Sequence, residues 1–252
     1  MSKIFLSVVI PSYDEMTNLK TGVLDRVDTF LSKKNFSYEV IVVDDGSTDG
    51  GIEFVSDFAK IHPEFRLLKN SHTGKAGAVT AGMLSAVGEY VLFTDMDQAA
   101  PIKEVDRLLP FFDKGFDIVI GSRSSTRKGA PWTRTLMALG MIILRKSLIG
   151  LSDISDTQCG FKMFRNSVVK RLFAKVNTIH NGFSAVSGSS VSAGFDVELL
   201  YVADKMKYKI KEVPVEWMYV ETRRVNPIKD SIEGLLDLVR IKKNDFSGVY
   251  NI

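Results

Sequence analysis

The stretch Val91-Leu92-Phe93-Thr94-Asp95-Met96-Asp97-Gln98 decides how the rest of the chain is interpreted. It joins an apolar run typical of a buried strand to two carboxylates at positions i and i+2. Open α/β sheets bind ligands at the carboxyl ends of their strands, where this pair would lie. Two carboxylates this close repel each other unless a cation or hydrogen-bond donors lie between them. The pair indicates either a divalent-metal site facing a diphosphate or two solvated loop acids.

Strand and helix patterns alternate along residues 1–122. Apolar or β-branched runs predict strands at residues 5–10, 38–43, 65–68, 91–94 and 116–120. Helical patterns lie between them, at residues 18–33, 51–61, 74–87 and 102–113. Asn18 is expected to cap the first of these helices, and Pro101 is expected at position N1 of the last. The alternation predicts an α/β fold with a mainly parallel central sheet flanked by helices.

Residues 118–152 contain no acidic side chain. The basic residues of this stretch are Arg123, Arg127, Lys128, Arg134, Arg145 and Lys146. Trp132 and a Met-containing apolar run at 136–144 lie among them. This composition is typical of an amphipathic helix in a membrane interface, where anionic headgroups balance the basic side chains. A core helix with solvated basic ends fits the same composition, and both interpretations stay open.

The second half continues with further elements and no internal repeat. The expected order is a loop entering a strand at 156–164, a Gly/Ser-rich loop at 181–194, a helix at 195–207 and a strand at 210–217. Asp230 is expected to cap a final helix with a wide apolar face. Because no clean linker interrupts the chain, we expect residues 1–252 to form a single domain.

The bulk composition narrows the possible functions. A net charge of +3 gives no global field that favours nucleic acid. The only cysteine, Cys159, excludes an internal disulfide framework and is expected to be a small buried apolar residue in a reducing compartment. The sequence has neither a signal-peptide pattern nor an apolar run near the ~20 residues that span a bilayer, so we expect a soluble or peripheral protein.

Four stretches in order resemble the motifs of the family 2 glycosyltransferases, which have a GT-A fold. They are Val9-Ile10-Pro11-Ser12-Tyr13-Asp14-Glu15, Val43-Asp44-Asp45-Gly46-Ser47-Thr48-Asp49, Gly74-Lys75 and Asp95-Met96-Asp97. Further stretches narrow the resemblance: Asp156-Thr157-Gln158-Cys159-Gly160-Phe161-Lys162, Phe195-Asp196-Val197-Glu198-Leu199-Leu200, and Val213-Pro214-Val215 to Asp230-Ser231. Over nearly its whole length the chain resembles the polyprenyl-phosphate branch, in particular the dolichyl-phosphate glucosyltransferases, which are related to the dolichyl-phosphate mannose synthases.

The resemblance implies a donor site for a nucleotide sugar in residues 1–122, completed by one later residue. The implied donor-binding residues are Pro11, Tyr13, Glu15, Asp44, Lys75, Asp95, Met96 and Arg224. Asp44 would contact the base, and Arg224 would grip the diphosphate from a loop. Asp95 and Asp97 would be the metal ligands and hold Mg²⁺ or Mn²⁺ against the diphosphate.

Residues 123–252 are implied to form the acceptor-binding and membrane-facing half, with amphipathic interfacial helices. Arg123 and Arg134 match basic positions near the acceptor phosphate, and with Asp95 and Asp97 they complete the implied catalytic set. Arginine suits this role because its charge is permanent and its forked donors match a phosphate. For Arg134 a surface position with the guanidinium in water stays an alternative.

Two features depart from the pattern of the mannose synthases. They commonly carry a glutamine two residues beyond the second aspartate, where this chain has Ala99, and Gln98 lies one residue earlier. The shift favours the glucosyl type and leaves a third metal ligand unassigned. Residues 181–190 resemble an insertion, which would lie at the acceptor entrance.

The predicted reaction is the inverting transfer of a hexose from a nucleoside diphosphate sugar to a polyprenyl or dolichyl phosphate. UDP-glucose is the first choice of donor and GDP-mannose the second. A phosphate monoester has its second pKa near ~6, so the acceptor needs no general base. Alternatives are transfer to a saccharide, which would need a base, or a non-catalytic nucleotide-sugar binder or membrane adaptor. We expect a cytoplasmic protein, peripheral at the inner face of an anionic membrane, with a membrane-protein partner there as a further option.

Overall fold

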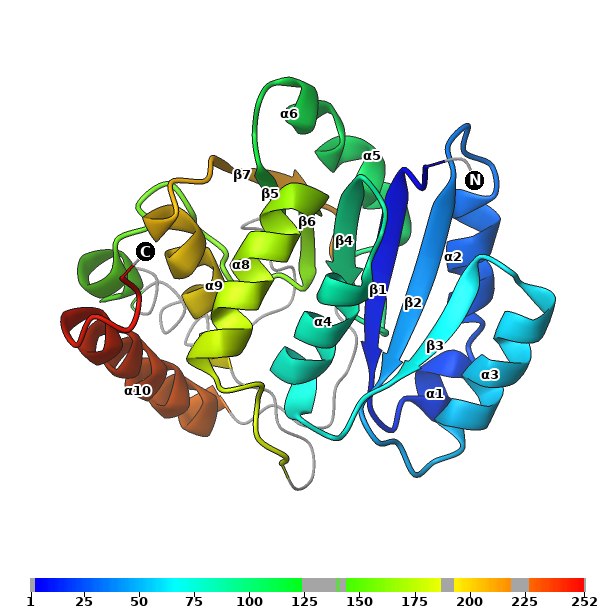
Figure 1. The fold of residues 1–252 in the computed structure, drawn as a ribbon, viewed down its shortest axis with the longest axis horizontal. Helices are drawn as coiled ribbons and strands as arrows, with labels where there is room; N and C mark the ends of the chain where they lie inside the picture. Colours follow the sequence, from blue (N-terminus) through cyan, green and yellow to red (C-terminus); the bar gives the residue numbers. More distant parts are fainter. Residues whose placement is uncertain (1–2, 124–139, 141–143, 187–192, 219–226, 252) are drawn as a thin grey trace.

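A seven-stranded sheet in the order β3-β2-β1-β4-β6-β5-β7 organises the protein (Figure 1). The computed structural model describes residues 3–123, 140, 144–186, 193–218 and 227–251. The strands are β1 (Leu6–Ser12), β2 (Tyr38–Asp44), β3 (Phe65–Lys69), β4 (Tyr90–Thr94), β5 (Ile118–Arg123), β6 (Phe161–Arg165) and β7 (Ile210–Val215). The α/β class and the predicted strand regions are therefore confirmed.

The sheet is mainly parallel, as predicted, with one antiparallel strand. β1 pairs in parallel with β2 and β4, and β7 with β5, while β6 runs antiparallel between β4 and β5. Thr94 at the end of β4 pairs with Phe161 at the start of β6. The reversal therefore brings the start of β6 to the sheet edge where the parallel strands end, and this edge carries the polar residues.

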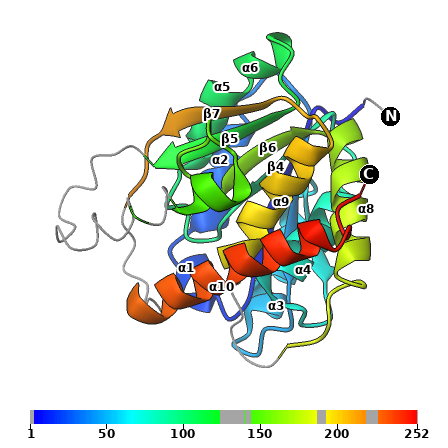
Figure 2. The same ribbon diagram turned by 90° about the vertical axis from the view of Figure 1, so that its left-hand side faces the viewer.

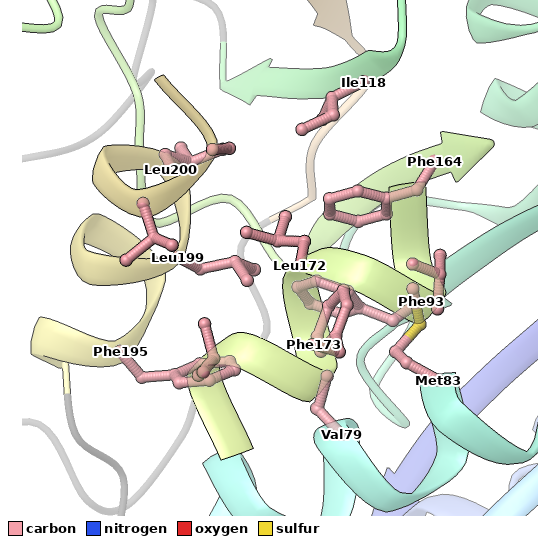
Figure 3. Packing of buried hydrophobic residues seen from close by; sticks show 14 of the residues in the cluster. Val79, Met83, Phe93, Ile118, Phe164, Leu172, Phe173, Phe195, Leu199 and Leu200 are labelled. Carbon is pink, nitrogen blue, oxygen red and sulfur yellow. The ribbon is translucent and has the colours of Figure 1, made fainter. Parts of the chain in front are cut away.

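Helices cover both faces of the sheet (Figures 1 and 2). They are α1 (Met16–Leu19), α2 (Val23–Leu31), α3 (Gly51–Ile61), α4 (Gly74–Ser85), η1 (Ile102–Glu104), α5 (Val105–Leu108), α6 (Pro110–Asp113), α8 (Asn166–Ile179), α9 (Ala193–Lys205) and α10 (Pro227–Phe246). One apolar core lies under α4, α8 and α9, where Val79, Phe93 and Phe173 pack together (Figure 3). The other lies on the opposite face, under α2, α3 and α5.

The small residues of α4 let it lie close against the sheet. A Cβ atom on Gly82 would lie 2.4 Å from Val9 Cγ1 of β1 and 2.7 Å from Val43 Cγ2 of β2. Real Cβ atoms do not approach other atoms so closely, so a larger residue would push α4 outward. The close approach sets the distance between the second half of α4 and the strands β1 and β2.

Three helix starts differ from the predictions. Asn18 lies inside α1, which already begins at Met16, and Gly22 in the left-handed conformation (φ 76°) separates α1 from α2. Pro101 is extended (ψ 146°) and precedes η1, and Pro110, which lacks an N–H, begins the separate helix α6. Asp230 falls inside α10, which begins at Pro227, a residue suited to a first helical turn.

Candidate active site

The two aspartates lie in the turn that follows β4. Lys75 Nζ, near the start of α4, lies 2.6 Å from Asp95 Oδ1. Asp97 Oδ1 accepts a hydrogen bond from the backbone N–H of Ala99 at 2.9 Å. The buried Gln98 side chain donates to Thr94 Oγ1 (3.2 Å) and to the Asp95 carbonyl (3.0 Å), which closes the turn. The two carboxylates are thus neither buried nor freely solvated, and one of them already contacts the Lys75 ammonium group.

Gly160 makes room for the Asp95 carboxylate. A Cβ atom at residue 160 would lie 1.9 Å from Asp95 Oδ2 and 2.5 Å from Asp95 Cγ. No side chain fits there without moving Asp95. The residue just before β6 is therefore a glycine where the backbone passes the Asp95 carboxylate.

Charge is unevenly distributed around Lys75. Burial lowers the pKa of Lys75, but the negative charges of Asp95 and Asp196 outweigh it and leave that pKa raised. Burial also raises the pKa of Asp97; the Ala99 N–H opposes this shift, and the charge of Asp95 adds to it. Asp95 and Asp97 therefore share Lys75 as their nearby lysine, an arrangement that favours a further cation.

The donor set fits a hard divalent cation. Within the described ranges, no group of three or more His, Cys, Asp and Glu side chains is arranged to hold a metal ion. Asp95 and Asp97 could supply two oxygen ligands, and Mg²⁺ commonly takes one or two protein carboxylates and completes its shell with substrate phosphates and water. Met96, between them, has its side chain buried in the apolar core, so any donor contact there would come from its backbone.

The expected nucleoside residues meet where β1 and β2 end. Ser12 pairs with Asp44 in the sheet, so Pro11 and Tyr13 lie beside this buried aspartate. Asp44 Oδ1 accepts the backbone N–H groups of Gly46 (3.0 Å) and Ser47 (2.9 Å). These bonds fix the turn after β2, while Glu15 accepts the side-chain amide of Asn18 at 2.5 Å.

Asp45 links this turn to the start of α4, a role that sequence reasoning missed. Its buried carboxylate accepts hydrogen bonds from Asn70 Nδ2 (2.6 Å), Thr73 N (2.9 Å) and Gly74 N (2.8 Å). The consequence is that the residue preceding Lys75 is fixed to the end of β2. The sequence signal for this role was the doublet Asp44-Asp45. Two adjacent acids at a strand end can be buried only where hydrogen-bond donors surround their carboxylates.

His72 lies against Tyr13 at the edge of the nucleoside region. The two rings are stacked with centroids 4.4 Å apart. His72 Nδ1 lies 2.7 Å from the Asp45 carbonyl oxygen and 3.2 Å from Asp45 Oδ2, two acceptors, so Nδ1 carries a proton. The described segment 181–186 reaches this place too, because Val186 N–H donates to the His72 carbonyl at 2.9 Å. The visible part of the expected insertion thus contacts the donor side.

Arg123, at the end of β5, forms a forked ion pair with Asp156. Arg123 Nε lies 2.7 Å from Asp156 Oδ2, and Nη2 lies 2.8 Å from Oδ1. Burial raises the pKa of the Asp156 carboxyl, but Arg123 outweighs it and leaves that pKa lowered. Glu212 accepts the Asp156 N–H at 2.7 Å. The fork uses one edge of the guanidinium, so Nη1 is the nitrogen outside it and Asp156 fixes its direction.

A second ion pair, formed by a fully buried lysine, lies between β6 and α9. Lys162 Nζ, fully buried, donates to Asp196 Oδ1 (2.5 Å) and to the Cys159 carbonyl (2.6 Å). Cys159 is buried, as predicted, and this burial raises the pKa of its thiol to about 12. Both ion-pair residues stood in quoted motifs, but only the fold shows that β6 and α9 bring them together.

The described geometry brings two acids, a lysine and an arginine together at one edge of an α/β sheet. Comparison with known proteins shows to which family this chain belongs. The family model "Glycosyl transferase family 2" matches residues 7–173, which include both aspartates. The chain belongs to glycosyl transferase family 2. It is therefore an enzyme of the glycosyltransferase class, as the motifs predicted.

Similar curated family 2 proteins are dolichyl-phosphate beta-glucosyltransferases. The Dictyostelium discoideum protein is 34% identical over 100% of this chain and 78% of its own length. The Saccharomyces cerevisiae protein is 30% identical, covering 98% of this chain and 77% of that protein. The human protein is 31% identical, with 98% and 78% covered. The predicted resemblance to this branch is confirmed.

Solved structures confirm the GT-A fold of this family 2 chain. Mannosyl-3-phosphoglycerate synthase from Rubrobacter xylanophilus superposes with a TM-score of 0.63 at 15% identity, over 97% of this chain and 75% of that one. Glucosyl-3-phosphoglycerate synthase from Mycobacterium tuberculosis gives 0.62 at 17% identity, over 95% and 80%. At these identities the likeness concerns the fold alone.

Several predictions about this family 2 enzyme concern residues outside the described ranges. Arg134 and Arg224 both lie there, as does most of the apolar run at 136–144. The roles of these two arginines stay predictions. Of the described helices, none combines the length and hydropathy needed to cross a bilayer.

Proposed function

We propose that this enzyme transfers a hexose, with inversion, from a nucleoside diphosphate sugar to a polyprenyl or dolichyl phosphate at a membrane surface. The observation that carries the proposal is that Asp156 directs the Arg123 guanidinium, with Nη1 outside the ion pair, on the same sheet edge as the Asp95–Lys75 pair. Arg123 suits an anionic acceptor, and the Asp95–Lys75 pair suits a diphosphate donor. The names of relatives aligned over 98–100% of the chain support this acceptor, and they support glucose as the sugar.

The donor would lie across the ends of β1, β2 and β4. Tyr13 and Asp44 would flank the nucleoside, and Lys75 would bind the diphosphate. A Mg²⁺ or Mn²⁺ ion held by Asp95 and Asp97 would supply positive charge against the charge that builds on the leaving diphosphate. The hydrogen bonds that fix Gly74 at the start of α4 and the turn that carries Asp95 keep these groups in place before the reaction, which is where electrostatic catalysis gains most.

The acceptor phosphate would approach from the β5 side, where Arg123 orients it. An oxygen of the ionised phosphate forms the new bond to the anomeric carbon as the bond from that carbon to the donor diphosphate breaks. The nucleoside diphosphate leaves with the electron pair. Because the attacking oxygen is already ionised near neutral pH, the step requires no proton transfer at that atom.

A screen of nucleotide sugars tests this proposal. Purified enzyme with Mg²⁺ or Mn²⁺ and a short-chain polyprenyl phosphate is expected to use UDP-glucose in preference to GDP-mannose, with radiolabel appearing in the organic phase. The matching polyprenol without phosphate is the control acceptor and is expected to remain unlabelled. Labelling of the free polyprenol, or of an added saccharide instead, would contradict a phosphate acceptor.

The outer face of α10 supports the membrane part of the proposal. Ile232, Leu236 and Val239 are 55%, 61% and 53% exposed, whereas Leu238 and Ile241 of the same helix are buried. Lys242 and Lys243 follow this apolar face. Figure 2 shows α10 as an outer helix lying across α9. An exposed apolar face beside basic residues suits the surface of an anionic bilayer.

We also propose that the enzyme is cytoplasmic and peripheral at this membrane. We further propose that residues 1–252 form one domain, because a single sheet takes strands from both halves of the chain.

Charging this face is expected to release the enzyme from membranes. The variant Ile232→Glu/Leu236→Glu should pellet with phosphatidylserine-containing vesicles several-fold less than the unmodified enzyme, because each glutamate opposes both burial and the anionic surface. The matched control is Ile61→Glu, which charges a still more exposed isoleucine at the end of α3. Equal pelleting of both variants and the unmodified enzyme would refute the assignment of α10.

A further inference from the structure

The ion pair between Lys75 and Asp95 has a consequence for the order in which ligands bind. The ammonium nitrogen lies 2.6 Å from Asp95 Oδ1, within direct contact of one of the two carboxylates that fit a divalent cation. A divalent ion bound by the same carboxylate would lie a few ångströms from a unit positive charge. Two cations at that separation repel strongly, so Lys75 and the ion compete for Asp95.

Lys75 is the partner that can move. Asp95 Oδ2 lies against Gly160, where even a methyl group would clash, and the preceding Gly74 is fixed by its hydrogen bond to Asp45. These contacts hold the carboxylate and the start of α4 in place. The lysine side chain is a flexible four-carbon stem and is partly exposed. Its ammonium group can therefore move away while the Asp95 carboxylate and the start of α4 stay in place.

The position of Lys75 on α4 indicates where it would go. A lysine in the first turn of a helix opposes the positive end of the helix dipole, so its placement depends on nearby acids. Asp45 already accepts the N–H groups of Thr73 and Gly74 at this N-terminus, so a diphosphate bound in front of α4 would meet chiefly the ammonium of Lys75. The donor therefore offers Lys75 a second anion of higher charge than Asp95.

We infer that Lys75 is an internal counter-ion that occupies Asp95 in the empty enzyme and transfers to the donor diphosphate when the donor and the divalent cation bind. This inference rests on the proposed function. It makes the binding of cation and nucleotide cooperative, because each ligand removes the obstacle to the other. Without nucleotide the enzyme would bind the cation only weakly.

Binding of Mn²⁺ alone, followed by electron paramagnetic resonance of the free ion, tests the inference apart from catalysis. Lys75→Met is expected to bind Mn²⁺ on the order of tenfold more tightly than the unmodified enzyme when no nucleotide is present. Lys75→Arg keeps the charge and should bind Mn²⁺ like the unmodified enzyme. The matched control is Lys69→Met, which removes an exposed lysine at the end of β3 and should also leave Mn²⁺ affinity unchanged.

The same titration with UDP present measures the cooperativity. UDP should strengthen Mn²⁺ binding more in the unmodified enzyme than in Lys75→Met, where the obstacle is already gone. Equal or weaker Mn²⁺ binding by Lys75→Met without UDP, while the unmodified enzyme binds Mn²⁺ with UDP, would overturn the counter-ion role alone. Failure of every variant to bind Mn²⁺, with or without UDP, would overturn both the role and the proposed metal site. Circular dichroism spectra confirm that each variant is folded.

Discussion

Replacement of Asp97 by asparagine is expected to lower kcat/KM for hexosyl transfer by at least about a hundredfold, because the charge that would hold the cation against the leaving diphosphate is lost. Asparagine keeps the size of the side chain and an oxygen that can accept the Ala99 N–H. The loss should therefore come from charge, with the fold intact. Initial rates with varied donor concentration measure it.

The control is Asp113→Asn, which removes an exposed acid on α6 and should leave kcat/KM unchanged. Chelation with EDTA should reduce the unmodified enzyme to the level of Asp97→Asn. Full activity of Asp97→Asn, together with indifference to EDTA, would show that Asp97 holds no metal.

The same substitution should raise the stability of the ligand-free enzyme near neutral pH. Burial and the neighbouring Asp95 raise the pKa of Asp97 in the folded state. A raised carboxyl pKa favours the folded state only while the group is protonated, so this contribution is lost as pH rises through the folded pKa. Asparagine cannot ionise, and in EDTA Asp97→Asn should melt about 1–4 °C higher at pH 7. The advantage should disappear at acidic pH, and a lower Tm at pH 7 would contradict the pKa shift.

Loss of Arg123 should separate acceptor binding from stability. Arg123→Met removes the group proposed to orient the lipid phosphate and leaves Asp156 without its forked partner. We expect the acceptor KM to rise at least about tenfold with a smaller change in donor KM, and stability to fall by about 1–3 kcal/mol, because the pair is partly exposed and screened. Steady-state kinetics and urea denaturation measure the two effects.

The double variant Arg123→Met/Asp156→Asn distinguishes the two roles. Removing both charges of a paired group is far less costly than removing one, so most of the lost stability should return while the acceptor KM stays high. Arg123 lowers the folded pKa of Asp156, so the stability that the pair provides is present above the unfolded pKa and is lost as pH falls through the folded one. If the double variant regains normal acceptor kinetics, Arg123 has only a structural role.

Local patterns in the sequence were sufficient to predict where the strands of this enzyme end. They were not sufficient to predict which distant residues contact those strand ends. The period of the apolar runs and the acids behind them placed Asp44, Asp95 and Arg123 on one sheet edge, as the structure confirms. The direction of β6 could not be predicted, because apolar alternation is the same in a parallel and an antiparallel strand. That direction is what brings Gly160 and Lys162 to the site.

Contacts between distant segments explain the remaining differences. Asp156 is 33 residues from Arg123, and Asp196 is 34 residues from Lys162, so neither ion pair has a local signal. Met96 stands between two partly exposed acids, yet the turn that Gln98 closes directs the Met96 side chain into the core. The helix predicted at 102–113 is divided because Pro110 cannot donate the hydrogen bond that would continue it.

The identity of the product tests the proposed reaction most directly. Purified enzyme should convert UDP-glucose and a short-chain polyprenyl phosphate to a polyprenyl glucosyl phosphate. Phosphorus nuclear magnetic resonance should show the monoester signal replaced by that of a diester, and the proton spectrum should show a β-linked glucose. An unchanged phosphate monoester beside free glucose, or an α-linked product, would contradict inverting transfer to the lipid phosphate.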